Sequence, residues 1–166
     1  MKKTTDRKFW LLKSEPSEFG IDDLEVAKKQ TTAWTGVRNY QVRNFFRDDF
    51  SVGDLGFFYH SSCPEPGIYG LVEITSAAYP DPTQFDPKSD YYDARSPSDN
   101  PRWLALDVKL VSKLDSPLLL DKMREISALA GMVVLSKGNR LSVTPVDKGH
   151  WSKILELTGS ASDHLG

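Results

Sequence analysis

The sequence predicts a single α+β domain in which five or six mostly antiparallel strands form a curved sheet, with short helices set between them. The chain has 166 residues, which is enough for one hydrophobic core and too few to argue for two domains. Short apolar runs are bounded by Gly, Pro, Asp and Ser, as is typical of strands, and the helical patterns between them are short. We therefore expect one domain over residues 9–158, flexible tails at 1–8 and 159–166, and a sheet that closes on itself as a small barrel.

Composition and charge exclude several classes of protein. Hydrophobic residues make up 39% of the chain and charged residues 27%, which favours a globular domain over a disordered or membrane protein. The formal net charge of −2 argues against a general nucleic-acid coat, because such a coat needs many clustered cations. With one cysteine and three histidines we expect no disulfide, no metal site and no cofactor. We expect a cytoplasmic protein, or a nuclear one if the source is eukaryotic.

The first third of the chain alternates between extended and helical patterns. Residues 9–13 predict a buried strand, which Pro16 closes because proline cannot continue a hydrogen-bonded ladder. Residues 20–28 predict a short helix, since acidic residues stand in its first turn and lysines in its last. Residues 30–35 are extended and carry β-branched threonines, which favours a second strand.

The segment Trp34–Tyr40 predicts either a small polar pocket or a turn from a strand into a helix. Gly36 allows a sharp turn or a close approach to a ligand. Arg38 offers donors in a planar fork, and Asn39 can cap a helix whose apolar residues recur up to Phe50. The two interpretations use the same residues, so both stay open at this point.

Two aromatic strands and a long polar segment follow. Residues 55–60 and 68–74 predict an antiparallel pair with a longer connection. Residues 79–102 are rich in Pro, Asp and Ser, and a loop of that length in a small domain is usually functional or mobile. A lid over a binding site is one function that fits it.

The last third of the chain begins with a half-buried strand, because residues 103–113 alternate between apolar and polar side chains. A helix is predicted at 118–129, and residues 132–135 form a short apolar run of undefined type. A strand at 141–144 should end at the proline that follows it. A final helix at 148–157 should bury a tryptophan and two aliphatic side chains.

Polar and aromatic side chains collect where the predicted strands end. These ends are Lys13–Glu15, Gly36–Asn39, Tyr59–Ser61 and Arg140–Ser142. In a small closed sheet such ends converge on one mouth. The aromatic residues nearby are Trp10, Trp34, Tyr59 and Tyr69. Their rings can surround the mouth, as an unstacked nucleobase requires, or they can simply fill the core.

A catalytic cluster is an alternative use of the same mouth. His60 is followed by two serines and a cysteine, but triads are assembled from residues distant in sequence, and no nucleophile-elbow pattern surrounds the serines. Glu15 and Glu18 can form an acid and base pair, although a glutamate just before a proline is more simply a turn residue. Glycine-rich phosphate loops are absent from the sequence.

Six motifs in order give the chain a resemblance to a known family. They are Trp10–Pro16, Trp34–Tyr40 with Arg43–Phe45, Phe57–Ser61, Glu65–Ile68, Ala78–Asp81 with Gln84–Phe85, and Arg140–Pro145. Each motif alone is weak, but together, at this spacing, they resemble the EVE domain family within the PUA-like superfold. The resemblance covers nearly the whole chain, from Trp10 to about Leu157.

The resemblance implies a PUA-like pseudobarrel related to the YTH readers of methylated adenine, with a pocket that takes a modified base. Trp34 and Tyr59 would be walls of the pocket. The groups presented to the base edge would come from Ser14, Val37 and Asn39, and those that hold phosphates or brace the pocket from Lys13, Arg38 and Arg140. The full base-binding set implied is Trp10, Lys13, Ser14, Trp34, Gly36, Val37, Arg38, Asn39, Tyr59, His60, Ser61, Arg140 and Ser142.

Three hypotheses about function follow. The first is a non-catalytic module that recognises a modified nucleobase, a modified cytosine in DNA or a modified base in RNA, and has no membrane or metal partner. The second is an enzyme acting on nucleotides or modified nucleic acid through His60 and Glu15. The third is an interaction module that works through the loop at 79–102. The short, mildly basic amino-terminal tail favours a bacterial, cytoplasmic protein.

Overall fold

The computed structural model describes residues 7–160, so the predicted tails at 1–8 and 159–166 lie for the most part outside the described residues. The strands are β1 (Phe9–Ser14), β2 (Thr31–Trp34), β3 (Leu55–His60), β4 (Gly67–Ile74), β5 (Tyr79–Pro80), β6 (Leu104–Leu119) and β7 (Val143–Val146). The α-helices are α1 (Ile21–Val26), α2 (Tyr40–Asn44), α3 (Leu120–Arg124) and α4 (Lys148–Thr158). Shorter helical turns lie at Lys28–Gln30, Phe45–Asp49, Pro82–Phe85, Ser127–Leu129 and Val133–Leu135. None of these helices is long and apolar enough to cross a membrane.

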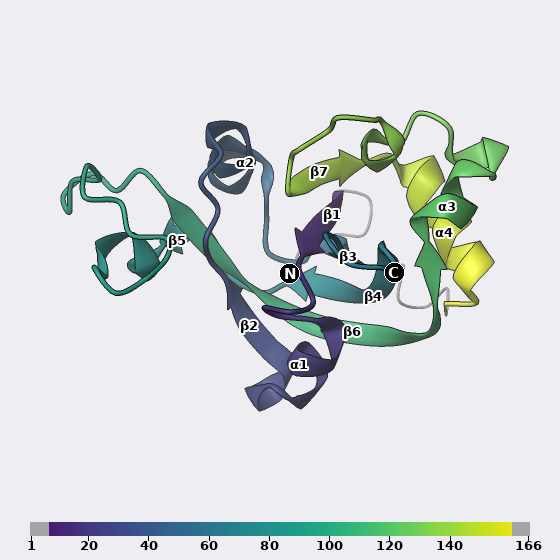
Figure 1. Cartoon of the computed structure of the whole chain (residues 1–166), viewed down its shortest axis with the longest axis horizontal. Coiled ribbons are helices and arrows are strands. Elements are labelled where there is room, and N and C mark those ends of the chain that lie inside the picture. Colours follow the sequence, from purple (N-terminus) through teal and green to yellow (C-terminus); the bar gives the residue numbers. More distant parts are fainter. Residues whose placement is uncertain (1–6, 161–166) are drawn as a thin grey trace.

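The strands form one strongly bent sheet in the order β2-β6-β4-β3-β1-β7, with β5 paired to β6 (Figure 1). All pairs are antiparallel except β1 with β3, which are parallel. The predicted α+β class with mostly antiparallel strands is therefore confirmed. No ladder joins β2 to β7 within residues 7–160, so the expected closed barrel is wrong in detail and the sheet stays open at these two edges.

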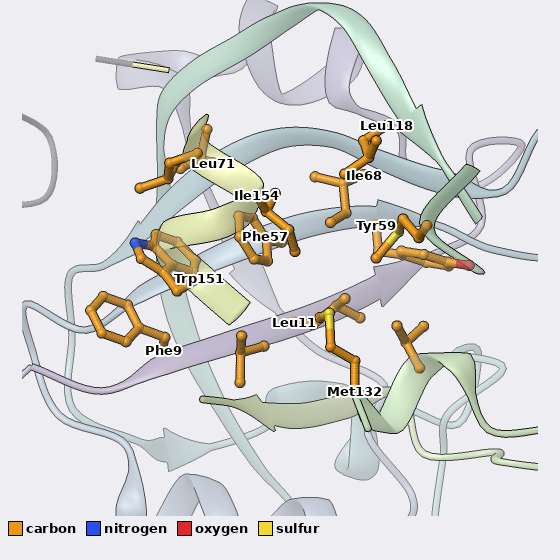
Figure 2. Packing of buried hydrophobic residues seen from close by; sticks show 14 of the residues in the cluster. Phe9, Leu11, Phe57, Tyr59, Ile68, Leu71, Leu118, Met132, Trp151 and Ile154 are labelled. Atoms are coloured by element: carbon orange, nitrogen blue, oxygen red, sulfur yellow. The ribbon is translucent and has the colours of Figure 1, made fainter. Parts of the chain in front are cut away.

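Successive side chains of β1 and β3 point to opposite faces of the sheet, so the buried side chains form two cores, one on each face. The helix-covered core contains Phe9, Leu11, Phe57, Tyr59, Ile68, Leu71, Leu118, Met132, Trp151 and Ile154, with further apolar side chains around them. The loop-side core contains Trp10, Leu12, Ile21, Leu24, Trp34, Val37, Val42, Phe46, Phe58 and Leu106, again with further apolar neighbours. Figure 2 shows Trp151 of α4 packed against Phe9 and Phe57, and its ring centroid lies 4.6 and 4.1 Å from theirs. The predicted burial of the last helix is confirmed.

Two of the predicted elements in the last third of the chain are wrong. The helix expected at 118–129 is limited to α3, because β6 continues to Leu119 and pairs Leu118 with Ile68 of β4. Pairing across the sheet overrides the local helix signal of Ser116-Pro117. Pro145 does not end the strand before it but lies inside β7. It is tolerated there because β7 is an edge strand, whose outer side needs no donor.

Candidate functional site

A cavity of about 720 Å³ opens on the loop-side face, where β1 and β2 end. Its walls come from these strand ends, the turn after each of them, the segments after β3 and before β7, and the loop at 79–102. The lining residues are Lys13, Ser14, Glu15, Glu18, Phe19, Thr32, Ala33, Trp34, Thr35, Gly36, Val37, Arg38, Ser61, Ser62, Asp90, Tyr91, Arg140 and Ser142. Segments far apart in sequence thus meet at one mouth, at the strand ends where the polar residues were expected to converge.

Most of the predicted site residues line this cavity. They are Lys13, Ser14, Trp34, Gly36, Val37, Arg38, Ser61, Arg140 and Ser142. Strand pairing brings them together: Lys13 N–H donates to the carbonyl of Ser142 at 2.7 Å, and Ser61 N–H donates to the carbonyl of Ser14 at 3.0 Å. Three separate chain segments are therefore aligned side by side at the mouth.

The other predicted residues lie elsewhere. Trp10 is buried, stacks on Phe50 at 3.9 Å and donates its indole N–H to Asp54 at 3.1 Å. Asn39 caps α2, since its side chain accepts from the N–H of Val42 at 3.1 Å, as the cap interpretation predicts. Neither side chain lines the cavity.

Tyr59 and His60 are also placed away from the lining. Tyr59 belongs to the helix-covered core, on the opposite face of the sheet from Trp34 (Figure 2). Adjacent strand residues point to opposite faces, and this odd-numbered position of β3 follows Leu55 and Phe57 into that core. Tyr59 is therefore not a wall of this cavity.

His60 is held as a structural group. Its Nε2 accepts from the N–H of Ile21 at 3.1 Å, and its ring stacks on Tyr69 with centroids 3.9 Å apart. Burial lowers the pKa of His60, against the opposing pull of Asp22 and Asp23. An imidazole whose acceptor nitrogen is already bonded to the backbone is poorly placed as a general base. Residues 7–160 contain no group of His, Cys, Asp or Glu side chains arranged to hold a metal ion.

Tyr91 is an aromatic lining residue that sequence reasoning missed as part of the site. Gly36, at φ +83°, has no side chain, and a Cβ placed there would lie 2.8 Å from the Tyr91 ring. The glycine thus lets the tyrosine lie directly against the turn after β2. The sequence showed only an aromatic residue in a polar loop, and nothing in its spacing places that ring over Gly36.

Arg38 and Asp81 fix the loop against this turn. Fully buried Asp81 accepts from the Gly36 N–H at 2.8 Å, from Arg38 Nη1 at 3.1 Å and from the Thr83 hydroxyl at 2.6 Å. Arg38 also donates to the carbonyl of Tyr91, from Nη2 at 2.6 Å and from Nε at 3.0 Å. With its donors used in this way, Arg38 braces the cavity wall.

Charged groups of both signs line the cavity. Lys13 and Arg140 are among them, and within the described part of the chain neither has a carboxylate at ion-pair distance. Burial lowers the pKa of Lys13. Burial, followed by the nearby negative charges of Glu18, Asp90 and Glu15, raises the pKa of Tyr91. The cavity can thus hold an anionic group beside Lys13 and Arg140 and hydrogen-bond donors beside the carboxylates near Tyr91.

The chain matches known proteins over almost its full length. The model of the EVE domain matches residues 8–157. Human thymocyte nuclear protein 1 is 40% identical over 165 residues, covering 89% of this chain and 72% of the human protein. A crystal structure of human THYN1 in complex with DNA containing 5-methylcytosine has a TM-score of 0.86 at 39% identity, covering 91% of this chain and 97% of that one.

Two further solved structures resemble this chain, one at high and one at low sequence identity. A crystal structure of a Pseudomonas syringae protein has a TM-score of 0.85 at 47% identity and covers 90% of this chain and 99% of its own. The YTH domain of Zygosaccharomyces rouxii MRB1, in complex with N6-methyladenosine RNA, has a TM-score of 0.52 at 12% identity, covering 92% of this chain and 86% of that one. At that identity the likeness concerns the fold alone.

Proposed function

Because this chain belongs to the EVE domain family, we propose that it is a non-catalytic module that binds a modified nucleobase, carried by DNA or RNA, in the cavity of about 720 Å³. The observation that carries the proposal is the lining of the cavity, which combines the aromatic side chains of Phe19, Trp34 and Tyr91 with two cations, Lys13 and Arg140, that no carboxylate of residues 7–160 pairs with. The human THYN1 complex with DNA containing 5-methylcytosine supports the same class of ligand.

Each part of the lining has a distinct proposed role. Trp34 and Tyr91 supply the aromatic walls, in place of the Trp34 and Tyr59 pair first expected. Ser14, Ser142 and the backbone at Val37 present hydrogen-bonding groups to the base edge. Aromatic stacking of a base is worth ~1–3 kcal/mol, which is enough for measurable affinity without many cations.

The charged groups add selectivity. Lys13 and Arg140 hold the phosphate of the bound nucleotide, since both line the cavity and neither forms an ion pair with a carboxylate of residues 7–160. Glu18 also lines the cavity, near Tyr91, where a carboxylate can accept from the exocyclic amine of cytosine. A thymine or uracil offers an acceptor at that position, so the carboxylate favours an amino-bearing base. A bacterial source and a cytoplasmic location remain predictions.

A titration with matched oligonucleotides tests the proposal. DNA and RNA strands with and without 5-methylcytosine are compared on the wild-type protein and on Tyr91→Ala. The control is Tyr92→Ala, because Tyr92 is a neighbouring tyrosine, 44% exposed, that does not line the cavity. We expect tighter binding of a modified strand, which Tyr91→Ala weakens about tenfold or more and Tyr92→Ala leaves unchanged. Equal binding of all strands, with steep salt dependence, would show that phosphates alone are bound.

A further inference from the structure

A chain of contacting rings and guanidinium groups, which we call the ridge, leads away from the cavity. It starts at Tyr91 and Arg38 in the cavity wall and continues over Trp103 and Tyr40 to Arg43. The guanidinium carbon of Arg38 lies 5.5 Å from the ring centroids of both Tyr91 and Trp103. Tyr40 stacks on Trp103 at 4.7 Å with an interplanar angle of 30°, and the Arg43 guanidinium lies 4.9 Å from the Tyr40 ring.

The ridge ends at a second groove, of about 620 Å³. Arg43 forms part of its wall, and the groove lies between the helical turns at 40–49, the segment before β5 and the start of β6. Its lining residues are Arg43, Phe46, Arg47, Phe50, Ser51, Val52, Ala77, Ala78, Asn100, Pro101 and Leu104. Most of them are apolar, and the cationic side chains stand on one side, from a single helical face.

The exposure and charge of these groups fit a nucleic-acid strand. Tyr40 is 51% exposed, although its ring stacks on buried Trp103 and the Arg43 guanidinium lies 4.9 Å from its centroid, so about half of this residue stays accessible to solvent. Arg43 donates to the Asn44 side chain and to the carbonyl of Arg102, and no carboxylate pairs with it at ion-pair distance in the described structure. Arg47 is held by Asp48 in two hydrogen bonds, so Arg43 supplies the positive charge that is available to a phosphate.

We propose that this ridge and the groove at its end form a second nucleotide subsite, which takes the nucleotide next to the one in the cavity in a single-stranded segment. The neighbouring base packs against the exposed part of Tyr40 and the guanidinium plane of Arg43, the phosphate lies beside Arg43, and the strand continues into the groove. Exposed rings and guanidinium planes bind bases without reading their sequence, whereas the cavity selects the modification. The inference rests on the proposed function, because the ridge needs a nucleotide in the cavity at its start.

The test compares a short ligand with a long one. Binding of a modified mononucleotide and of a modified ten-nucleotide strand is measured on Tyr40→Leu and Arg43→Gln, with Tyr92→Leu as the control. Leucine keeps Trp103 covered while removing the stacking face, and thermal unfolding confirms that each variant is folded. Tyr40→Leu should weaken strand binding about tenfold and leave mononucleotide binding unchanged. Arg43→Gln should reduce the dependence of strand binding on log salt concentration by about one.

The two proposals fail in different ways. Strand binding that Tyr40→Leu and Arg43→Gln leave at the level of Tyr92→Leu would overturn the second subsite. Equal losses for mononucleotide and strand would also overturn it, because they would place Tyr40 within the cavity's own ligand site. Failure of the wild-type protein to prefer any modified ligand would instead overturn the proposed function, whatever the ridge variants do.

Discussion

One face of the sheet is covered by α3 and α4 and filled by apolar side chains (Figure 1). The opposite face is covered by α1, α2 and loops, and keeps an open cavity beside its own apolar core. On the helix-covered face, Trp151 fills the space between Phe9 and Phe57, and its indole N–H has no hydrogen-bond partner in the described part of the chain. The Trp151 side chain is therefore held in that core by packing.

The loop-side face depends on polar contacts for its shape. Asp81 and Gln84 are fully buried there, and the Gln84 side chain bonds to the carbonyls of Asp81 and Trp103 and to the Ser96 hydroxyl. Directional bonds of this kind hold a loop in one conformation without filling the space beneath it. The helix-covered face is thus filled by apolar packing, whereas the loop-side face combines an apolar core with a hydrogen-bonded loop beside the cavity.

The largest expected effect is on the helix-covered face. Trp151→Ala removes a fully packed aromatic side chain and should lower the free energy of unfolding by ~3–5 kcal/mol. Trp151→Phe should cost less, since a phenyl ring keeps part of the stack. Urea denaturation measures both changes. The molecules that stay folded should bind oligonucleotide as the wild type does, and loss of binding in folded Trp151→Phe would contradict the division between the faces.

Asp81→Asn should act on both stability and binding. It removes the charge that holds Arg38 and leaves buried donors without a full set of acceptors, at a cost of about 1–3 kcal/mol. Because the same contacts place Tyr91 against Gly36, affinity for a modified strand should fall even where the protein is fully folded. Titration at a temperature well below the unfolding midpoint separates these two effects. Unchanged affinity would show that the loop's position does not matter for binding.

The pH dependence of stability should be smaller. Burial holds the pKa of His60 below its ordinary value of about 6.5, so the unfolded chain binds the proton more readily than the folded one. Stability should therefore rise as the pH rises towards 6.5, level off above it, and fall as the pH drops below it. Unfolding midpoints of wild type and His60→Gln between pH 5 and 8 measure this. If the unfolding midpoint changes with pH by the same slope in both proteins, titrating groups other than His60 cause the change.

The smallest effect on stability is expected for Lys13→Gln. Burial lowers the pKa of Lys13, which means that the charged ammonium is disfavoured at its position, so removing the charge should leave stability unchanged or slightly raised. Binding should weaken for every strand, modified or not, with a shallower salt dependence. A matched control is Lys122→Gln, because the Lys122 side chain is 66% exposed and belongs to α3 on the helix-covered face. If both variants bind the strands equally well, Lys13 does not contribute to ligand binding.

Local sequence patterns predicted most of the strands because alternation and apolar runs report directly on burial. The cap of α2 at Asn39 was also predictable, since asparagine is a preferred residue at the start of a helix, where its side chain accepts from a free backbone N–H. The helix at 118–129 was predicted wrongly because the pairing of Leu118 with Ile68 is a contact between distant segments. For the same reason, nothing local placed Tyr91 over Gly36. The face of Tyr59 does follow from alternation with Leu55 and Phe57, but the face that carries the cavity is set by distant segments.

The four tryptophans offer the most direct test of where the ligand binds, because Trp34 lines the cavity and Trp151 lies in the opposite core. A protein labelled with nitrogen-15 in its tryptophan side chains is titrated with a strand containing 5-methylcytosine, and the indole N–H resonances are followed. The Trp34 resonance should shift on binding, and the Trp151 resonance should stay in place. A shift of Trp151 without one of Trp34 would show that the ligand binds the helix-covered face, and would contradict the assignment of the cavity as the site.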